Sequence, residues 1–145
     1  MTRLYYWLHA QTQYSIHSPF LFDMYREVLF ARLTPEERRR HGIPRHDRYQ
    51  ELIYKCCNHY HMEVASPQPG AHGGTLLLTH LNINTLTHSN NLSILLLSSP
   101  HATPAAEQQW EKLKADPDYQ VSIDLYDVAL LIRNPHLHRQ HFLLR

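Results

Sequence analysis

The chain has 145 residues, and its 14 lysines and arginines nearly balance its 13 acidic residues, which gives a formal charge of +1. This length suffices for one domain with a substantial core and is too short for two domains that each have such a core. The balanced charge gives no electrostatic reason to expect nucleic acid or an anionic membrane as a partner. The 13 histidines are unusual, and they predict a chain that becomes cationic in mild acid.

The only cysteines are the adjacent pair Cys56 and Cys57, so no internal disulfide framework is expected. Such cysteine use is typical of a reducing compartment, and we expect a cytoplasmic protein. The first residues lack the long apolar core and the small-residue cleavage site of a signal peptide. No apolar run approaches the roughly 18 residues of a membrane-spanning helix.

Residues 3–12 predict a short helix that carries Leu4, Trp7 and Leu8 on one face. A second helix is expected after Ser18, which suits an N-cap because Pro19 follows it at the first helical position. The apolar residues that follow are dense enough for a helix covered on much of its surface. They are Phe20, Phe22, Met24, Val28, Leu29 and Leu33.

A third helix is predicted from Thr34, which can form a capping box with Glu37, to Gly42 and Pro44. The arginine run 38–40 within it has two interpretations, a phosphate clamp or a solvated face near a helix C-terminus. The second is favoured because cations are stabilised at that end of a helix.

A fourth helix is predicted within residues 48–64, with both cysteines on its apolar stripe as core residues rather than ligands or nucleophiles. Residues 66–74 form a loop by composition, and residues 75–83 fit either a helix or a strand.

The run LSILLLSSP predicts a buried strand of a parallel sheet. A helix capped by Thr103 follows it. Residues 119–134 predict two strands joined by a tight connection at Tyr126, and residues 141–145 are expected to extend or finish the second strand. The order strand, helix, strand, strand predicts a Rossmann-like α/β edge.

Three segments resemble, in order, a bacterial group of class I S-adenosylmethionine-dependent methyltransferases with an HSPF-type N-terminal extension. HSPFLFDMYREVL resembles the extension, and RYQELIYKCCNHY resembles the helix before the family's first strand. LLLSSPHATPAAEQQWEKLKADPDYQVSIDLYDVALLIR, with QHFLLR, is similar to the family's C-terminal strand, helix and closing hairpin. The resemblance implies an α/β fold, with an N-terminal helical extension at 1–47 and a reduced Rossmann-like, methyltransferase-like sheet at 48–145 that ends in an antiparallel hairpin.

The middle of the chain departs from the family. The resemblance places the cofactor at a glycine-rich turn, which corresponds here to EVASPQPGAHGGTLLL. Prolines 67 and 69 stiffen this turn and remove N–H donors, and no acid lies between Thr75 and Leu97 to accept ribose hydroxyls. Residues 48–145 are also about half of a complete fold of this type. We therefore expect no cofactor, or S-adenosylmethionine if the protein is active, with candidate binding residues Ser66, Gly70, Gly73 and Gly74.

After the late strand, where relatives tend to have paired acids, this chain has Ser98 and Ser99. His101 is the candidate for a surviving catalytic base, because it follows that strand at the end where α/β sheets bind ligands. A structural role is the favoured interpretation for a lone histidine. Asp124 and Asp127 are interpreted as turn-forming residues rather than a catalytic pair.

Histidines 136, 138 and 141 are candidate zinc ligands, and His59 with His61 forms a second possible set. An i, i+2 pair shares one side only in a strand, and no cysteine or well-spaced carboxylate completes either set. We therefore expect no physiological metal site.

Three functions stay open. The favoured one is a methyltransferase-like pseudoenzyme that forms a homodimer or joins a related protein, because loss of strands exposes apolar surface and sheet edges. The second is an active S-adenosylmethionine-dependent methyltransferase that acts on a small molecule. The third is a histidine-rich binding module that responds to metal or pH.

Overall fold

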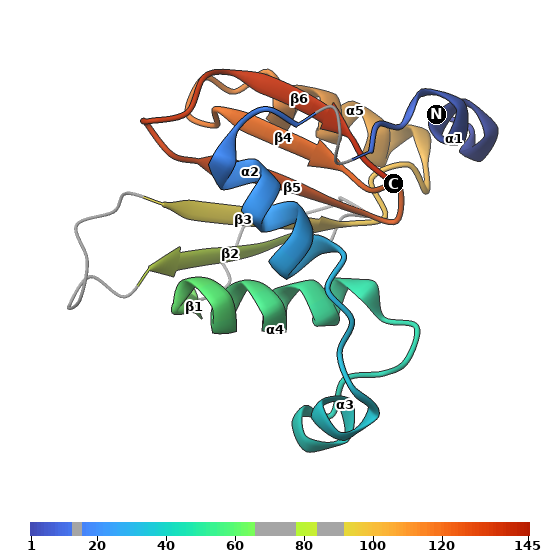
Figure 1. The fold of residues 1–145 in the computed structure, drawn as a ribbon. Helices are drawn as coiled ribbons and strands as arrows, with labels where there is room; N and C mark the ends of the chain where they lie inside the picture. The colour runs from blue at the N-terminus through green and yellow to red at the C-terminus, as the bar shows by residue number, and fades with distance from the viewer. Residues whose placement is uncertain (13–15, 66–77, 84–91) are drawn as a thin grey trace.

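The computed structural model describes residues 1–12, 16–65, 78–83 and 92–145, and Figure 1 shows their α/β arrangement. The helical elements are α1 (Arg3–His9), α2 (Pro19–Met24), the π-helical turn η2 (Tyr25–Leu29), α3 (Pro35–His41), α4 (Arg48–Tyr60) and α5 (Pro104–Lys114). The strands are β1 (Met62–Val64), β2 (Leu78–Ile83), β3 (Ser93–Ser98), β4 (Val121–Asp124), β5 (Val128–Arg133) and β6 (Gln140–Leu143). Most helical elements precede the first strand in sequence, α5 lies between β3 and β4, and the strands form one open, mixed sheet.

The strands lie in the order β1-β2-β3-β5-β4-β6. All neighbouring pairs are antiparallel except β4 with β6. The predicted parallel environment of β3 is therefore wrong, since both of its neighbours run antiparallel to it. An apolar run shows that both faces of a strand are covered, and it carries no information on the direction of the neighbours.

The last strand also differs from its prediction. Residues 141–145 were expected to extend or finish the second strand of the hairpin, whereas β6 is a separate strand that pairs parallel with β4. Beyond it, an isolated bridge joins Leu144 to Gln11, and the Tyr6 hydroxyl donates a hydrogen bond to the Leu144 carbonyl. These contacts attach the N-terminal segment to the edge of the sheet that β6 forms.

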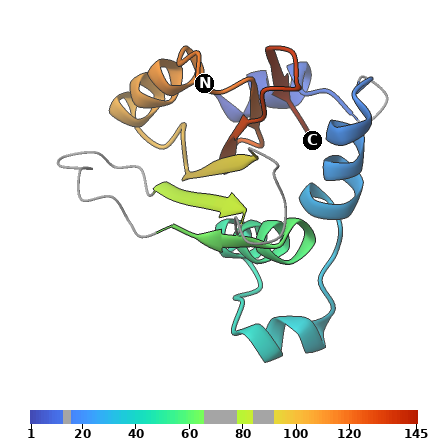
Figure 2. The same ribbon diagram turned by 90° about the vertical axis from the view of Figure 1, so that its left-hand side faces the viewer.

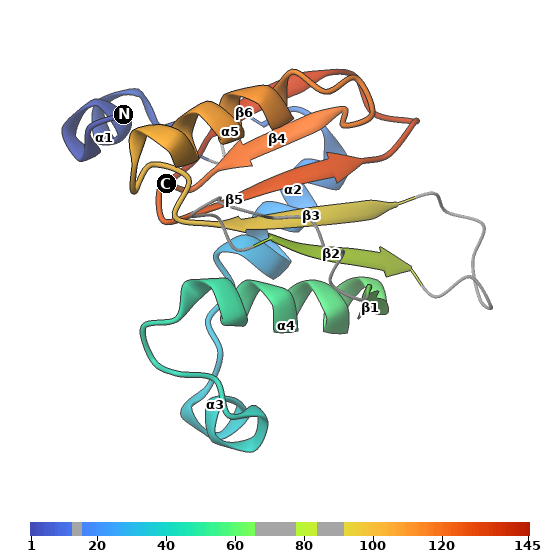
Figure 3. The ribbon, with the colours of Figure 1, turned by 180° about the vertical axis from the view of Figure 1, so that it is seen from behind.

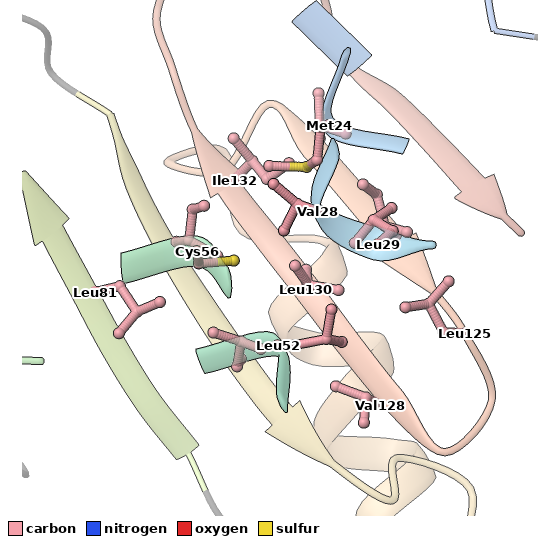
Figure 4. Packing of buried hydrophobic residues seen from close by; sticks show 14 of the residues in the cluster. Met24, Val28, Leu29, Leu52, Cys56, Leu81, Leu125, Val128, Leu130 and Ile132 are labelled. Carbon is pink, nitrogen blue, oxygen red and sulfur yellow. The ribbon is translucent and has the colours of Figure 1, made fainter. Parts of the chain in front are cut away.

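Helices cover the sheet on both faces. Alternate residues of β3 point to opposite sides, as strand geometry requires: Ile94 and Leu96 face α2, η2 and α4, whereas Leu95 and Leu97 face α5. Figure 1 shows the first layer in front of the sheet, and Figure 3, which is seen from behind, shows α5 on the opposite face. The first layer contains the larger core, which Figure 4 shows from close by.

The confirmed helix starts are those with strong local signals. Thr34 forms the predicted capping box with Glu37, and Gly42 ends α3 in the left-handed conformation with φ 63°. Thr103 caps α5, as expected. Ser18 occupies the N-cap position of α2 without a side-chain capping bond.

The helix that begins at Pro19 widens into the π-helical turn before it ends, and its residues Met24, Val28 and Leu29 point toward the sheet (Figure 4). Leu52 and Cys56 of α4 lie beside them in the same core. Burial raises the pKa of the Cys56 thiol to about 12, so this cysteine is an unreactive core residue, as predicted.

Two helices stand apart from this core. The α1 helix lies beyond the sheet near the start of α5, and α3 projects at the opposite end of the molecule (Figures 1 and 2). None of the helices in the described parts of the chain is long and apolar enough to cross a membrane.

Candidate functional site

A buried cluster of ionisable groups lies where β3 and β4 end. His101 follows β3, and its Nε2 atom is 2.7 Å from Oδ2 of Asp124, the last residue of β4. Its Nδ1 atom is 3.2 Å from Oε1 of Glu107 on α5. The side chains of His101 and Asp124 are only 3% and 8% exposed. The strand–helix–strand connection brings these residues together although they are far apart in sequence.

The surroundings of His101 favour the imidazolium form. Burial lowers its pKa, but hydrogen bonding to Asp124 and the charge of that carboxylate, together with Glu107, outweigh burial, so the pKa of His101 is raised. Each ring nitrogen then donates to one carboxylate. A general base needs a free ring nitrogen, and both are engaged here. The catalytic role of His101 therefore stays a prediction, and the observed contacts fit the structural interpretation.

Asp124 accepts hydrogen bonds from two further groups besides His101. Its Oδ2 atom also accepts a hydrogen bond from Trp110 Nε1 at 3.2 Å, and its Oδ1 atom accepts one from the Tyr126 amide at 2.8 Å. The second bond supports the predicted turn-forming role, since Tyr126 takes a left-handed φ of 70° in the tight connection. The first places Trp110, which is fully buried, against the sheet.

The N-terminal segment joins the same cluster. The Met1 ammonium group contacts Glu107, and this contact is the main reason why the pKa of Glu107 is lowered. The Arg3 guanidinium pairs with both carboxylate oxygens of Asp127 at 3.1 Å and lies 5.1 Å from the centre of the Tyr126 ring. These contacts fix the start of α1 over the end of the sheet.

A small open pocket of about 320 Å³ adjoins this end of the sheet. We call it the strand-end pocket. Ser98 and Ser99 from the end of β3 line it, with Asp127 from the β4–β5 connection. The remaining lining residues precede or begin α4, and they are His46, Asp47, Arg48 and Tyr49, together with Val128 of β5. The pocket is polar, carries both signs of charge, and lies at the C-terminal end of a strand.

The candidate cofactor-binding residues Ser66, Gly70, Gly73 and Gly74 lie outside the described residues. Their predicted role therefore stays a prediction. The strand-end pocket does contain Ser98 and Ser99.

The candidate metal ligands do not form one group. His136 and His138 line a second pocket, of about 390 Å³, together with His17. His141 lies elsewhere, with its Nδ1 atom 2.5 Å from the Ser122 hydroxyl, and burial lowers its pKa. No group of three or more histidine, cysteine or acidic residues in the described ranges could hold a metal ion.

The largest exposed apolar side chains gather on α1. Leu4 is 68% exposed, Tyr5 52%, Trp7 59% and Leu8 62%. Among the residues that the structure describes, the other exposed large apolar side chains are single residues on β1 and α2. Arg145 lies 4.9 Å from the centre of the Trp7 ring and donates to the Trp7 carbonyl at 2.8 Å, which anchors the C-terminal end of α1. The helix is thus held firmly while its apolar face stays open.

Sequence reasoning missed the partnership of His101 with Asp124. A usable signal exists, because a strand–helix–strand connection returns the second strand in the direction of the first, so that the residues ending both strands meet at one edge. The contacts of Met1 and Arg3 carry no comparable signal, since they depend on where α1 is placed.

Comparisons of this chain with protein-family models, with curated proteins and with solved structures give no match.

Proposed function

We propose that this protein is a methyltransferase-like pseudoenzyme that serves as a structural, partner-binding subunit and forms a homodimer or joins a related chain. The observation that carries the proposal is the open apolar face of α1. Leu4, Trp7 and Leu8 were expected on one face of this helix, and all three side chains are more than half exposed.

The size of this face supports an interface. Four large side chains of this exposure offer on the order of a few hundred Å² of apolar surface, which is the range in which patches on soluble proteins are often functional. A standard interface covers about 800 Å² per partner, with aromatic residues enriched at its centre. The α1 face has the composition of such a centre, because Tyr5 and Trp7 lie on either side of Leu4 and Leu8 on the helix.

The rigid placement of α1 supports the same proposal. Its first turn is tied through Arg3 to Asp127, and its last turn through Arg145 to the Trp7 carbonyl. A helix held at both ends presents its side chains without a large ordering cost on binding.

The test is the mass of the protein in solution, measured by size-exclusion chromatography with light scattering. We expect the wild type to exceed the mass of one chain at about 100 μM, a concentration that populates micromolar complexes. The triple variant Leu4→Ser/Trp7→Ser/Leu8→Ser should be a folded monomer. Val64→Ser, which removes a 54% exposed valine from β1, is the matched control and should keep the wild-type mass.

A monomeric wild type at that concentration would rule out the homodimer. Loss of association in the Val64→Ser control, with the α1 variant unaffected, would instead place the interface at the β1 edge of the sheet.

The strand-end pocket favours a second candidate, an S-adenosylmethionine-dependent methyltransferase acting on a small molecule. Its volume of about 320 Å³ falls at the lower end of the range of ligand sites. Ligands of α/β sheets bind outside the C-terminal ends of strands, and Ser98 ends β3 there. Calorimetric titration with S-adenosylmethionine and with its demethylated product tests this candidate, and absence of heat at millimolar ligand would end it.

A further inference from the structure

The α3 helix is well defined at both ends yet contributes nothing to the core. Its capping box and its left-handed Gly42 stop are complete, but none of its residues is buried. Figures 1 and 2 show that it projects away from the sheet. Helices in proteins gain most of their stability from packing of an apolar face. The capped helix α3 has no buried apolar face, which indicates that it has another role.

Some of the arginines in and around α3 form an ion pair with an acidic side chain, and others do not. Arg38 forms an ion pair with Glu51 and donates to the Pro44 carbonyl at 3.2 Å. Arg40 pairs with Glu36 at 3.1 Å, and the Arg48 guanidinium lies 5.2 Å from the centre of the Phe30 ring.

Arg39 on α3 and Arg45 in the turn that follows it form no ion pair with an acid. All 13 acidic residues of the chain lie within the described ranges, and none of those side chains forms an ion pair with either arginine. Both arginines are exposed. Two guanidinium groups thus keep their full charge and their donors available on one side of α3.

Both unpaired arginines line the same pocket, which we call the arginine pocket. It has a volume of about 460 Å³ and is open to solvent. Arg38, which is paired with Glu51, also lines the pocket. The other lining side chains are apolar, namely Pro35, Ile43 and Pro44, and Gly42 leaves space because it has no side chain. Nothing lies within 4 Å of the position that a Cβ at Gly42 would occupy.

We propose that the arginine pocket docks an acidic peptide segment of a partner protein, with carboxylates on Arg39 and Arg45 and an apolar side chain against Pro35 and Ile43. The guanidinium fork matches a carboxylate with two parallel hydrogen bonds. The apolar wall between the two cations suits a segment in which acidic and apolar residues alternate. This surface lies on α3 and does not depend on the α1 interface.

The neighbouring acids argue against nucleic acid as the occupant. Glu36, Glu37 and Asp47 border the region, and they would repel a continuous phosphate backbone. The net charge of the chain is only +1. A short peptide with two carboxylates satisfies the two arginines without reaching these acids.

The test is fluorescence polarisation of the full chain with a labelled peptide of alternating leucine and glutamate. We expect saturable binding that weakens with added salt. The double variant Arg39→Ala/Arg45→Ala should weaken binding at least about tenfold, in line with the loss of charge-assisted hydrogen bonds. Replacing the leucines of the peptide by glycine should weaken binding as well, and replacing the glutamates by lysine should abolish it.

Arg40→Ala is the matched control. It removes an exposed arginine from the same helix, but one that already has Glu36 as its partner. Binding should stay at the wild-type level in this variant, and circular dichroism should show the same helix content in all variants. The α1 triple variant should also bind the peptide normally, so failure of the proposed oligomer and failure of the arginine pocket give different results.

Three outcomes overturn the proposal. The first is absence of peptide binding at millimolar concentration, and the second is an equal loss in Arg40→Ala and in the double variant. The third is tighter binding of a short single-stranded or duplex DNA through the same two arginines, which would assign the pocket to phosphates.

Discussion

The two tryptophans of this chain occupy neighbouring helices with opposite environments. Trp110 of α5 is fully buried against the sheet and donates its indole N–H to Asp124. Trp7 of α1 is 59% exposed, although its helix is anchored to the same end of the sheet. An apolar pattern shows that a helix has an apolar face, whereas only the fold shows whether the same chain covers it. Four predictions test this contrast, from the largest expected effect on stability to the smallest.

Trp110→Ala should have the largest effect. The substitution leaves a large cavity between α5 and the sheet and removes a donor from the buried Asp124 carboxylate. We expect the free energy of unfolding to fall by about 3–5 kcal/mol, as for other buried aromatic residues. Urea denaturation followed by circular dichroism measures this. A loss of less than about 1 kcal/mol would mean that α5 packs loosely.

Asp124→Asn should come next, with a loss of about 2–3 kcal/mol, because it leaves His101 without its closest counter-ion in a buried position. The amide oxygen can still accept from the Tyr126 amide, which limits the loss. Asp127→Asn is the control, since the Arg3–Asp127 pair is exposed and should contribute no more than about 1 kcal/mol. Equal losses in the two variants would contradict a special role for Asp124.

The pH dependence of stability should reveal the charge on His101. The pKa of His101 is raised in the folded state, so its contribution is fully present below the unfolded pKa of about 6.5 and is lost as pH rises through the folded value. The difference in unfolding free energy between wild type and His101→Gln should therefore shrink from pH 6 to pH 9. A difference that grows over this range would show that the buried ring is neutral.

Trp7→Ser should have the smallest effect on stability. The exposed indole loses only its contact with the Arg145 guanidinium, so the free energy of unfolding should change by less than about 1 kcal/mol. Association measured by light scattering should weaken at the same time. A stability loss as large as that of Trp110→Ala would mean that α1 packs within its own chain, and would remove the contrast.

The sequence predicted the helices well because their ends are encoded locally. Thr34, Gly42 and Thr103 act on backbone groups only three or four residues away, so their roles are readable without the fold. The turn at Tyr126 is local in the same sense.

The sheet could not be predicted in this way. The direction of strands beside β3 depends on pairing between segments far apart, and the apolar run SILLLS is compatible with parallel or antiparallel neighbours. The three-residue strand β1 is too short to show any periodicity. β6 was missed as a separate strand for the first reason, since it pairs with β4, from which β5 separates it in sequence.

The candidate site was predictable only in part. His101 was selected because of its place after a strand, but its partners Asp124 and Glu107 depend on how α5 lies against the sheet. The apolar face of α1 could be predicted from the sequence pattern, whereas its exposure to solvent could not. The arginine run 38–40 contained two lining residues of the arginine pocket, Arg38 and Arg39, and Arg45 joins them only because the chain turns at Gly42.

The junction between the two ends of the described fold constrains the order of folding. Gln11 receives its backbone partners from Leu143 and Arg145, and the Tyr25 hydroxyl donates to the Arg145 carbonyl at 2.9 Å. These contacts span more than a hundred residues, and closing such long loops slows folding. During synthesis, α1 leaves the ribosome before β6 and has no docking place until β6 has followed. Its apolar face is therefore exposed throughout translation, so a partner that binds α1 could engage the nascent chain before the sheet is complete.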